Sequence, residues 1–355
     1  MSHNNITLNI PPGATANVKI IDTTSRISKL ETSYFMRPPL AGMEYMPTLP
    51  AWSFLIESPS GRKILFDLGA PKDWEHLAPV TSERLKRLGW DIKVEKNVVE
   101  ILEEHGVRGA DVESMIWSHW HWDHIGDPST FPSTTELVVG PGFKDAFLPG
   151  YPAKQDSPLR ETDFKGRTVR EIDFDNSQTI KVGPFRALDF FGDGSFYLVD
   201  TPGHAIGHMS GLARTTSNPD TFIFMGGDLC HHGGEIRPSK HLSIPAEITP
   251  QQCRALCCPG AMLEEVQKQR GRSPTEPFFE PNMGLSIEEA IRTIQKAQEI
   301  DASENVLFVF AHDDTLHGVV DLFPLSANEW KSKGWREQMQ WVFLKDLKKA
   351  VEGSS

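Results

Sequence analysis

The sequence has few of the features that mark secreted or membrane-spanning proteins. It contains four cysteines in 355 residues, and Cys253-x-x-x-Cys257-Cys258 is not a usual zinc or redox spacing. The longest apolar runs, such as Val306–Ala311, fall far short of the roughly 20 residues that a membrane helix needs. The first residues lack the basic and apolar regions of a secretory signal. We therefore expect a cytoplasmic protein whose cysteines are reduced and have no functional role.

The balance of charge also narrows the choice of partners. Asp and Glu number 48 against 36 Lys and Arg, which gives a formal net charge of −12. An acidic chain repels phosphate backbones, so the composition argues against a nucleic-acid partner. The sequence has no long run of like charges that would indicate a membrane-surface patch, and no repeat or low-complexity tract. We therefore expect a small molecule as the substrate. A chain of 355 residues can also bury a large core.

Apolar runs bounded by turn residues predict that most of the chain up to about residue 260 is rich in strands. The predicted strands are 18–21 (at a sheet edge), 53–57, 63–67, 115–117, 137–139, 185–190, 196–199, 211–214 and 222–225, with 306–310 following later. A helix is predicted over 97–105, ending at Gly106, and another begins at the capping box of Ser286 and Glu289. The spacing of Met339, Val342 and Leu347 predicts a final amphipathic helix over 335–351.

Two segments combine apolar side chains with several prolines and do not resemble core elements. Residues 29–50 suit a flap over a pocket or a contact surface in a homodimer, and an ordinary irregular loop is an equally good interpretation. Residues 245–283, with a short helix expected over 261–268, suit an inserted cap. We therefore predict a single hydrolase-like domain over residues 1–355.

The most informative feature is the sequence His119-Trp-His121-Trp-Asp123-His124, which follows the apolar residues 115–117. Packing gives no reason to crowd three imidazoles and one carboxylate together, whereas divalent metal ions do, because both groups suit zinc and similar cations. In a partly extended loop alternate side chains point the same way, so His119 and His121 can bind one ion. Asp123 and His124 are then left for a neighbouring ion.

Three other predicted strand ends carry similar groups. His204 follows the strand at 196–199, Asp228 follows 222–225, and His312 follows 306–310. His208, four residues beyond His204, is a rival ligand that otherwise serves as a packing or hydrogen-bonding residue. Each of these residues alone would be weak evidence, but together with the His-rich loop they indicate that several strands end in one cleft.

These motifs resemble the metallo-β-lactamase superfamily. The signature His-x-His-x-Asp-His is matched at 119–124, and the later motifs are matched by Thr-Pro-Gly-His204, Gly-Gly-Asp228 and His312. The resemblance implies an α+β fold, an αββα sandwich of two mixed sheets flanked by helices. It also implies two metal sites: His119, His121 and His204 for the first ion, Asp123, His124 and His312 for the second, and Asp228 as a bridge. Asp67 resembles the family's early Asp-x-Gly turn, which orients a ligand histidine.

This ligand set favours hydrolysis by a bridging hydroxide held between two divalent ions. Zinc is the first choice of metal, with Mn²⁺ or Fe²⁺ as alternatives. That hydroxide would attack the carbonyl carbon, so no serine or cysteine nucleophile is required, and Asp123 could pass a proton to the leaving atom. The expected reaction is hydrolysis of an ester, lactone, amide or thioester.

The chain most resembles the quorum-quenching lactonase branch and its fungal lactamase relatives. That branch often has a tyrosine shortly after the bridging aspartate, where this chain has His231 and His232. His231 could donate a hydrogen bond to the substrate or protonate a leaving nitrogen, whereas a solvated turn is the plain alternative for both histidines. We therefore predict a lactone or lactam hydrolase, with a glyoxalase-type thioesterase or a mononuclear iron sulfur dioxygenase as alternatives.

Overall fold

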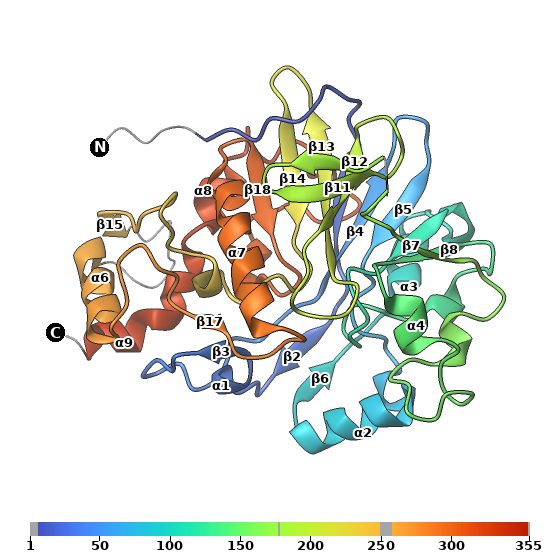
Figure 1. Cartoon of the computed structure of the whole chain (residues 1–355), viewed down its shortest axis with the longest axis horizontal. Helices are drawn as coiled ribbons and strands as arrows, with labels where there is room; N and C mark the ends of the chain where they lie inside the picture. The colour runs from blue at the N-terminus through green and yellow to red at the C-terminus, as the bar shows by residue number, and fades with distance from the viewer. Residues whose placement is uncertain (1–5, 177, 249–257, 354–355) are drawn as a thin grey trace.

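The computed structural model describes residues 6–176, 178–248 and 258–353, and within these residues two six-stranded sheets pack face to face (Figure 1). The first sheet has the order β1 (Asn17–Asp22), β4 (Trp52–Glu57), β5 (Lys63–Phe66), β7 (Ser114–Ile116), β8 (Glu136–Val139) and β9 (Val169–Glu171). The second has the order β10 (Ile180–Val182), β11 (Phe185–Asp189), β12 (Phe196–Asp200), β13 (Met209–Thr216), β14 (Thr221–Met225) and β18 (Val306–Val309). Both sheets are mixed, since β5-β7-β8-β9 and β14-β18 are parallel and the remaining pairs are antiparallel.

The strands are apolar on both faces because both faces are covered. In β4, Phe54 and Ile56 belong to the core between the sheets, whereas Leu55 packs on the outer side. In β14, Met225 faces the inner core and Phe224 the outer layer. This alternation follows from the period of two along a strand, and runs of apolar residues with both faces buried are typical of such layered sheets.

Helices complete the outer layers. On the first sheet, Leu102 of α3 (Val98–Glu104) and Phe143 of α4 (Phe143–Phe147) share a cluster with the outer strand residues. On the second sheet, Ile294 and Ile300 of α7 (Ile287–Ala302) pack with Phe224. The predicted αββα sandwich is therefore confirmed.

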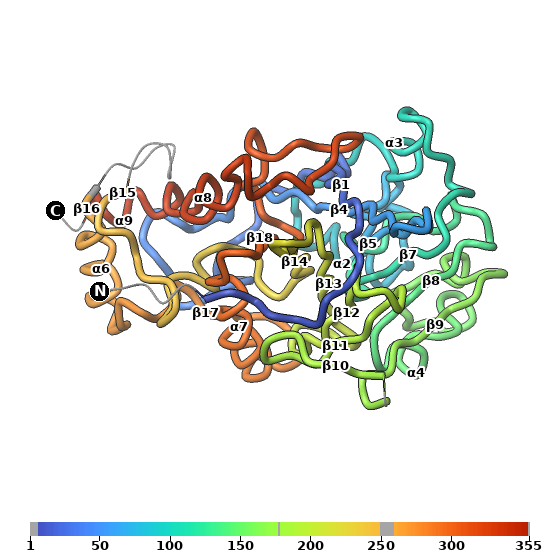
Figure 2. The backbone as a smooth tube through the Cα atoms, turned by 90° about the horizontal axis from the view of Figure 1, so that it is seen from above, coloured from blue at the N-terminus to red at the C-terminus, as the bar shows by residue number. Residues whose placement is uncertain are grey.

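The remaining elements are short and lie mostly at the periphery. The other helices are α1 (Thr32–Phe35), α2 (Pro79–Leu88), α6 (Gly260–Gln269), α8 (Trp335–Met339) and α9 (Lys348–Glu352). Three small sheets pair β2 (Arg26–Ser28) with β6 (Asp91–Lys93), β3 (Met36–Arg37) with β17 (Glu280–Pro281), and β15 (Glu247–Ile248) with β16 (Cys258–Pro259). Short 3-10 turns are η1 (Trp74–His76), η2 (Gly109–Asp111), η3 (Pro128–Thr130), η4 (Glu161–Asp163), η5 (Gly233–Glu235), η6 (Asp314–Leu316) and η7 (Val342–Leu347). Figure 2 shows α6 and α9 at one end of the molecule and α3 and α4 at the other.

The two proline-rich segments lie side by side. Strand β3, from the segment 29–50, pairs antiparallel with β17, from the segment 245–283, so that Arg37 lies opposite Glu280. Phe35, Phe278 and Phe279 belong to one apolar cluster. The short helix expected over 261–268 is present as α6. Flap, cap and homodimer surface remain predictions for these segments.

The strands and the first two helices predicted from the sequence are present, but the single final helix over 335–351 is wrong. The structure has α8, η7 and α9 in its place. The break has a long-range cause, because the carbonyl of Gln340 accepts a hydrogen bond from the Arg237 guanidinium at 2.6 Å. Leu344 N–H, the helical partner of that carbonyl, bonds instead to Trp341 O. Three consecutive residues are also buried here, namely Trp341, Val342 and Phe343. An amphipathic helix buries only one face, so it could not bury all three.

None of the described helices is long and apolar enough to cross a membrane. Cys230 is buried and reduced. Cys253, Cys257 and the side chain of Cys258 lie outside the part of the chain that the structure describes. A cytoplasmic location remains a prediction.

Candidate metal centre

The seven predicted ligands lie together, in the loops that follow β7, β12, β14 and β18. Their nitrogen and oxygen atoms form two groups, and within each group all ligand atoms lie within 4.8 Å of one another. The first group contains His119, His121, His204 and Asp228, and the second contains Asp123, His124 and His312. The structure thus brings together four stretches of chain that are far apart in the sequence.

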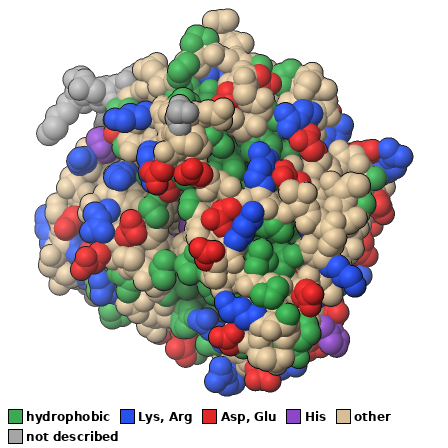
Figure 3. Space-filling view, turned by 45° about the vertical axis from the view of Figure 1, so that its right-hand side comes forward, with side chains coloured by type: hydrophobic (Ala, Val, Ile, Leu, Met, Phe, Trp, Pro, Cys, Tyr) green, Lys and Arg blue, Asp and Glu red, His purple; other side chains and the backbone are tan. Residues whose placement is uncertain are grey.

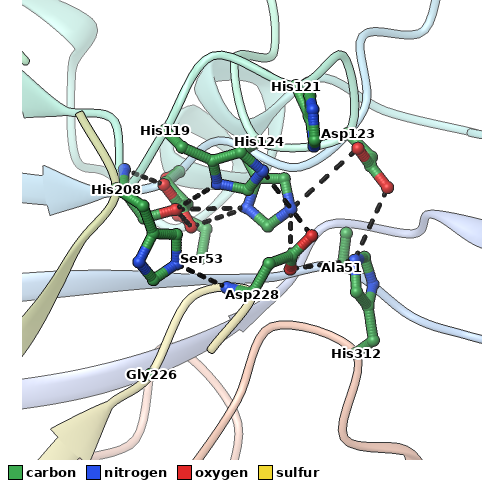
Figure 4. Close-up of polar contacts among 12 residues, drawn as sticks. Ala51, Ser53, His119, His121, Asp123, His124, His208, Gly226, Asp228 and His312 are labelled. Atoms are coloured by element: carbon green, nitrogen blue, oxygen red, sulfur yellow. Dashed lines mark hydrogen bonds and ion pairs between the residues drawn. The ribbon is translucent and has the colours of Figure 1, made fainter. Parts of the chain in front are cut away.

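Asp228 lies between the two groups (Figure 4). Its Oδ2 is 3.6 Å from His119 Nε2 and 3.4 Å from His204 Nε2. Its Oδ1 is 3.0 Å from His124 Nε2 and 3.2 Å from His312 Nε2. Each oxygen of one carboxylate therefore faces a different group, which is the geometry a bridging ligand requires.

The other ligand atoms complete the two groups. His121 Nδ1 is 3.0 Å from His204 Nε2. Asp123 Oδ2 is 3.5 Å from His312 Nε2, and Asp123 Oδ1 is 3.9 Å from His124 Nε2. The residues matching His-x-His-x-Asp-His are thus divided between the two groups in the way that the sequence predicted.

Hydrogen bonds on the outer side of the site fix the orientation of the imidazoles. Nδ1 of His124 donates to Asp67 Oδ2 at 2.8 Å, and Nδ1 of His312 donates to Pro50 O at 2.7 Å. Asp67 also accepts from the backbone N–H and the hydroxyl of Ser118. It does so from a left-handed conformation with φ 58°, which a non-glycine residue rarely adopts. These bonds leave Nε2 of His124 and His312 facing Asp228, as metal-ligating histidines require.

The donor atoms fit divalent cations. Nε2 of His119, Nε2 of His124 and Oδ1 of Asp228 are buried, and none of them has a hydrogen-bond partner among the described residues. A buried polar atom without a partner is costly, and a bound cation would satisfy all three. Nitrogen and carboxylate oxygen are the ligands that zinc and related ions accept.

The electrostatics of the site are consistent with this fit. Burial lowers the pKa of His121 to about 3 and holds those of His119 and His204 well below their usual value, so these rings keep a free lone pair. Burial opposes ionisation of Asp228, but the adjacent histidines, His124 foremost, hold its pKa well below the usual value. Burial would also lower the pKa of His124, yet Asp228 and then Asp67 raise it well above normal. A cation bound at His124 must therefore displace a proton.

His208 lies beside the first group but makes other contacts. Its Nδ1 donates to Thr201 O at 2.7 Å, and its Nε2 accepts the backbone N–H of Asp228 at 3.1 Å. His208 thus holds the backbone of Asp228 in place, in agreement with the hydrogen-bonding alternative, while His204 lies within the ligand group.

The two histidines after Asp228 face different surroundings. His231 Nε2 is 3.3 Å from Asp228 Oδ2, and the His231 ring lies 5.2 Å from that of Phe35. His232 Nε2 instead lies 3.3 Å from Asp346 Oδ2, on the C-terminal segment. The exposed fractions are 4% for His231 and 3% for His232, so the solvated turn considered for both is wrong. The C-terminal segment and the 29–50 segment cover them.

A cavity of about 390 Å³ opens beside the centre. Five residues of the centre and its neighbourhood line it, namely His121, Asp123, Asp228, His231 and His312. Much of the remaining wall is aromatic or aliphatic, formed by Tyr34, Phe35, Trp90, Trp120, Phe147 and Leu85. Figure 3 shows hydrophobic side chains gathered across the lower middle of one face, with charged side chains of both signs around them.

Comparison with known proteins identifies the family. The model of the metallo-beta-lactamase superfamily matches residues 46–215. The chain is 45% identical over 345 residues to gamma-lactamase FDB1 of Fusarium pseudograminearum (strain CS3096), covering 94% of this chain and 83% of that protein. The chain belongs to the metallo-β-lactamase superfamily.

Two further comparisons give a longer relative and a solved structure. The chain is 43% identical to the cytochrome P450 monooxygenase mpaDE of Penicillium roqueforti (strain FM164) over 98% of this chain, which spans only 39% of that protein. Among solved structures, an N-acyl homoserine lactone hydrolase with the product N-hexanoyl-L-homoserine at its metal centre aligns with a TM-score of 0.57. That alignment has 18% identity and covers 89% of this chain and all of the other, so it supports the superfamily fold alone.

Two parts of this metallo-β-lactamase site were missed by sequence reasoning. Helix α2, which lines the cavity, carries Pro79 at its first position and Gly89 after its end, two ordinary helix signals that could have revealed it. Glu235 is buried, and its Oε2 accepts the backbone N–H groups of His231 and His232 at 2.6 and 3.2 Å. Nothing in the local sequence distinguishes this glutamate from a surface residue.

Proposed function

We propose that this chain is a metal-dependent hydrolase that opens a lactone or lactam ring. The observation that carries the proposal is the position of Asp228, whose two oxygens face two groups of ligands at the end of a largely apolar cavity. The similarity to a gamma-lactamase supports a cyclic amide, and the shared fold with an acyl homoserine lactone hydrolase is compatible with a cyclic ester.

Two divalent ions fit the site, with zinc as the first choice and Mn²⁺ or Fe²⁺ as alternatives. His119, His121 and His204 would hold one ion, Asp123, His124 and His312 the other, and Asp228 both. When bound, such ions lower the pKa of a water molecule and polarise the carbonyl that it attacks.

The residues of the chain supply the remaining functions. The aromatic wall binds the apolar body of the substrate and limits the access of bulk water to the reacting bond. His231 lines the cavity beside Asp228 and donates a hydrogen bond to the substrate. Asp123 also lines the cavity, where it can carry a proton to the leaving oxygen or nitrogen. Asp123, Asp228 and His231 are therefore the proposed catalytic residues.

A panel of γ-lactones, γ-lactams and glutathione thioesters, offered to metal-reconstituted protein, tests the proposal. We expect turnover of the cyclic substrates, two metal ions per chain by elemental analysis, and loss of turnover in Asp228→Ala. The matched control is Asp163→Ala, which removes a buried carboxylate paired with Arg160 away from the centre. Turnover of thioesters alone, or a single iron ion with no ring opening, would overturn the proposal in favour of the thioesterase or the dioxygenase.

A further inference from the structure

Helix α2 presents one face to the cavity. Thr81, Arg84, Leu85 and Leu88 line it, and their spacing of three, four and seven residues places them on one side of a helix. Thr81 Oγ1 donates a hydrogen bond to Pro158 O at 2.8 Å, so α2 is fixed to the segment 154–158 that forms the neighbouring wall. Arg84, one turn further along the same face, also lines the cavity, and its side chain is exposed to solvent there.

The guanidinium of Arg84 keeps its charge uncompensated. It donates a hydrogen bond to the hydroxyl of Tyr34, a neutral partner on α1 that also lines the cavity. No carboxylate forms an ion pair with Arg84 among the residues that the structure describes. A guanidinium has five N–H donors, so most of them remain available to a ligand.

A second cation lines the same cavity. Lys154 donates to the backbone carbonyl of Ala146, and no carboxylate within the described ranges forms an ion pair with it. Asp156 is the one carboxylate of the wall besides the candidate metal ligands, and it is exposed and pairs with neither cation. Two cations that form no ion pair with a carboxylate therefore line the same cavity, in a chain whose net charge is −12.

We propose that the substrate carries an anionic group, of the carboxylate class, at the end remote from the ring that is opened, and that Arg84, assisted by Lys154, binds this group. The inference rests on the proposed function in treating the cavity as the substrate site. The apolar wall around Leu85 and Trp90 would bind the body of the molecule between the two ends. The planar guanidinium can bind a carboxylate through two parallel hydrogen bonds, which a neutral substrate end cannot offer.

A matched pair of ligands tests this selection independently of turnover. N-adipoyl-homoserine and N-hexanoyl-homoserine are the ring-opened forms of two lactones that differ only in a terminal carboxylate against a methyl group. The carboxylate formed by ring opening is common to both, so its binding to the metals cancels in the comparison. Binding to the metal-loaded protein is measured by calorimetry at low and high salt, and kcat and KM are measured for the two lactones.

We expect the wild-type protein to bind the adipoyl compound roughly fivefold more tightly at low salt, as for one partly exposed ion pair. High salt reduces this ratio because it screens the charges. Arg84→Gln weakens binding of the adipoyl compound alone, which brings the ratio of the two affinities close to one. Arg84→Lys keeps part of the preference for the adipoyl compound. The control Arg87→Gln, an exposed residue of α2 outside the cavity wall, leaves the ratio unchanged.

The results separate this inference from the proposed function. Equal binding of the two compounds by the wild type, or a ratio unaffected by Arg84→Gln, overturns the assignment of Arg84 even when both lactones are opened. A charge preference that depends on Arg84, together with no ring opening of any cyclic substrate, supports the anion site and contradicts the proposed hydrolysis.

Discussion

Nδ1 of His124 donates a hydrogen bond to Oδ2 of Asp67 at 2.8 Å, and Nε2 of the same ring lies 3.0 Å from Oδ1 of Asp228. The imidazole is thus held from behind by one carboxylate while its other nitrogen faces the centre of the site. Asp67 lies at the end of β5 and His124 in the loop after β7, so the two adjacent parallel strands together determine the orientation of this ring.

Asp67→Ala removes the acceptor that fixes His124. We expect metal affinity to fall by about 10- to 100-fold, as for other residues that support a metal-bound histidine. Competition with a chelator of known affinity measures this change. Asp22→Ala, which removes a carboxylate paired with Arg26 elsewhere on the first sheet, should leave metal affinity unaltered. Equal losses in both variants would mean that Asp67 acts only on overall stability.

His231→Ala is expected to lower kcat for ring opening by about 100-fold, because it removes a hydrogen-bond donor from the cavity. Metal content should stay at the wild-type level in elemental analysis. The neighbouring His232→Ala is the matched control, since His232 contacts Asp346 and does not line the cavity. Loss of metal from His231→Ala would assign this residue to the ligand set instead.

Glu235→Ala leaves the buried N–H groups of His231 and His232 without their acceptor. We expect the free energy of unfolding to fall by about 2 kcal/mol, the typical cost of unpaired buried donors. Urea denaturation of the metal-free proteins measures it. Glu235→Gln, which keeps an accepting oxygen, should lose less, and Glu299→Ala on the exposed side of α7 should lose almost nothing. A Gln variant as unstable as the Ala variant would contradict the assigned role.

Arg237→Ala breaks a buried ion pair with Asp301, in which the two N···O distances are 2.9 and 2.5 Å. An unpaired buried carboxylate is costly, so we expect a loss of about 3–5 kcal/mol in the free energy of unfolding. The comparison is Arg62→Ala, which breaks an ion pair with Glu113. The side chains of Arg62 and Glu113 are 40% and 42% exposed, so this pair should contribute less than about 1 kcal/mol to the free energy of unfolding. Denaturation curves that rank the two variants in the opposite order would show that Asp301 is stabilised by other groups.

The sequence located the candidate ligands because their chemistry is concentrated and follows recognisable strands. Four of them occupy residues 119–124, and His204, Asp228 and His312 each follow a strand that the structure contains. Distances among these seven residues depend on how the two sheets stack. The resemblance to the family implied this stacking, whereas the local sequence pattern alone does not predict it.

The errors arose where distant parts of the chain act on one another. The final helix is broken at Gln340 because Arg237, about a hundred positions earlier, donates a hydrogen bond to the Gln340 carbonyl. His231 and His232 were open to interpretation as a solvated turn because the side chains that bury them, Phe35 and Asp346, are remote in sequence. The sequence alone indicates no role for Arg84, because only the fold brings α2 to the wall of the cavity.

The candidate ligands follow the central strands, whereas Arg84 and Lys154 belong to segments that connect those strands on the outside. Under the two proposals, the hydrolytic centre and the anion-binding end of the cavity would therefore belong to separate parts of the architecture. Changes in α2 and the 154–158 segment would then alter substrate preference while the hydrolytic centre stays unchanged. For protein engineering, these outer connections are the positions to randomise when a different ring-bearing molecule is to be accepted.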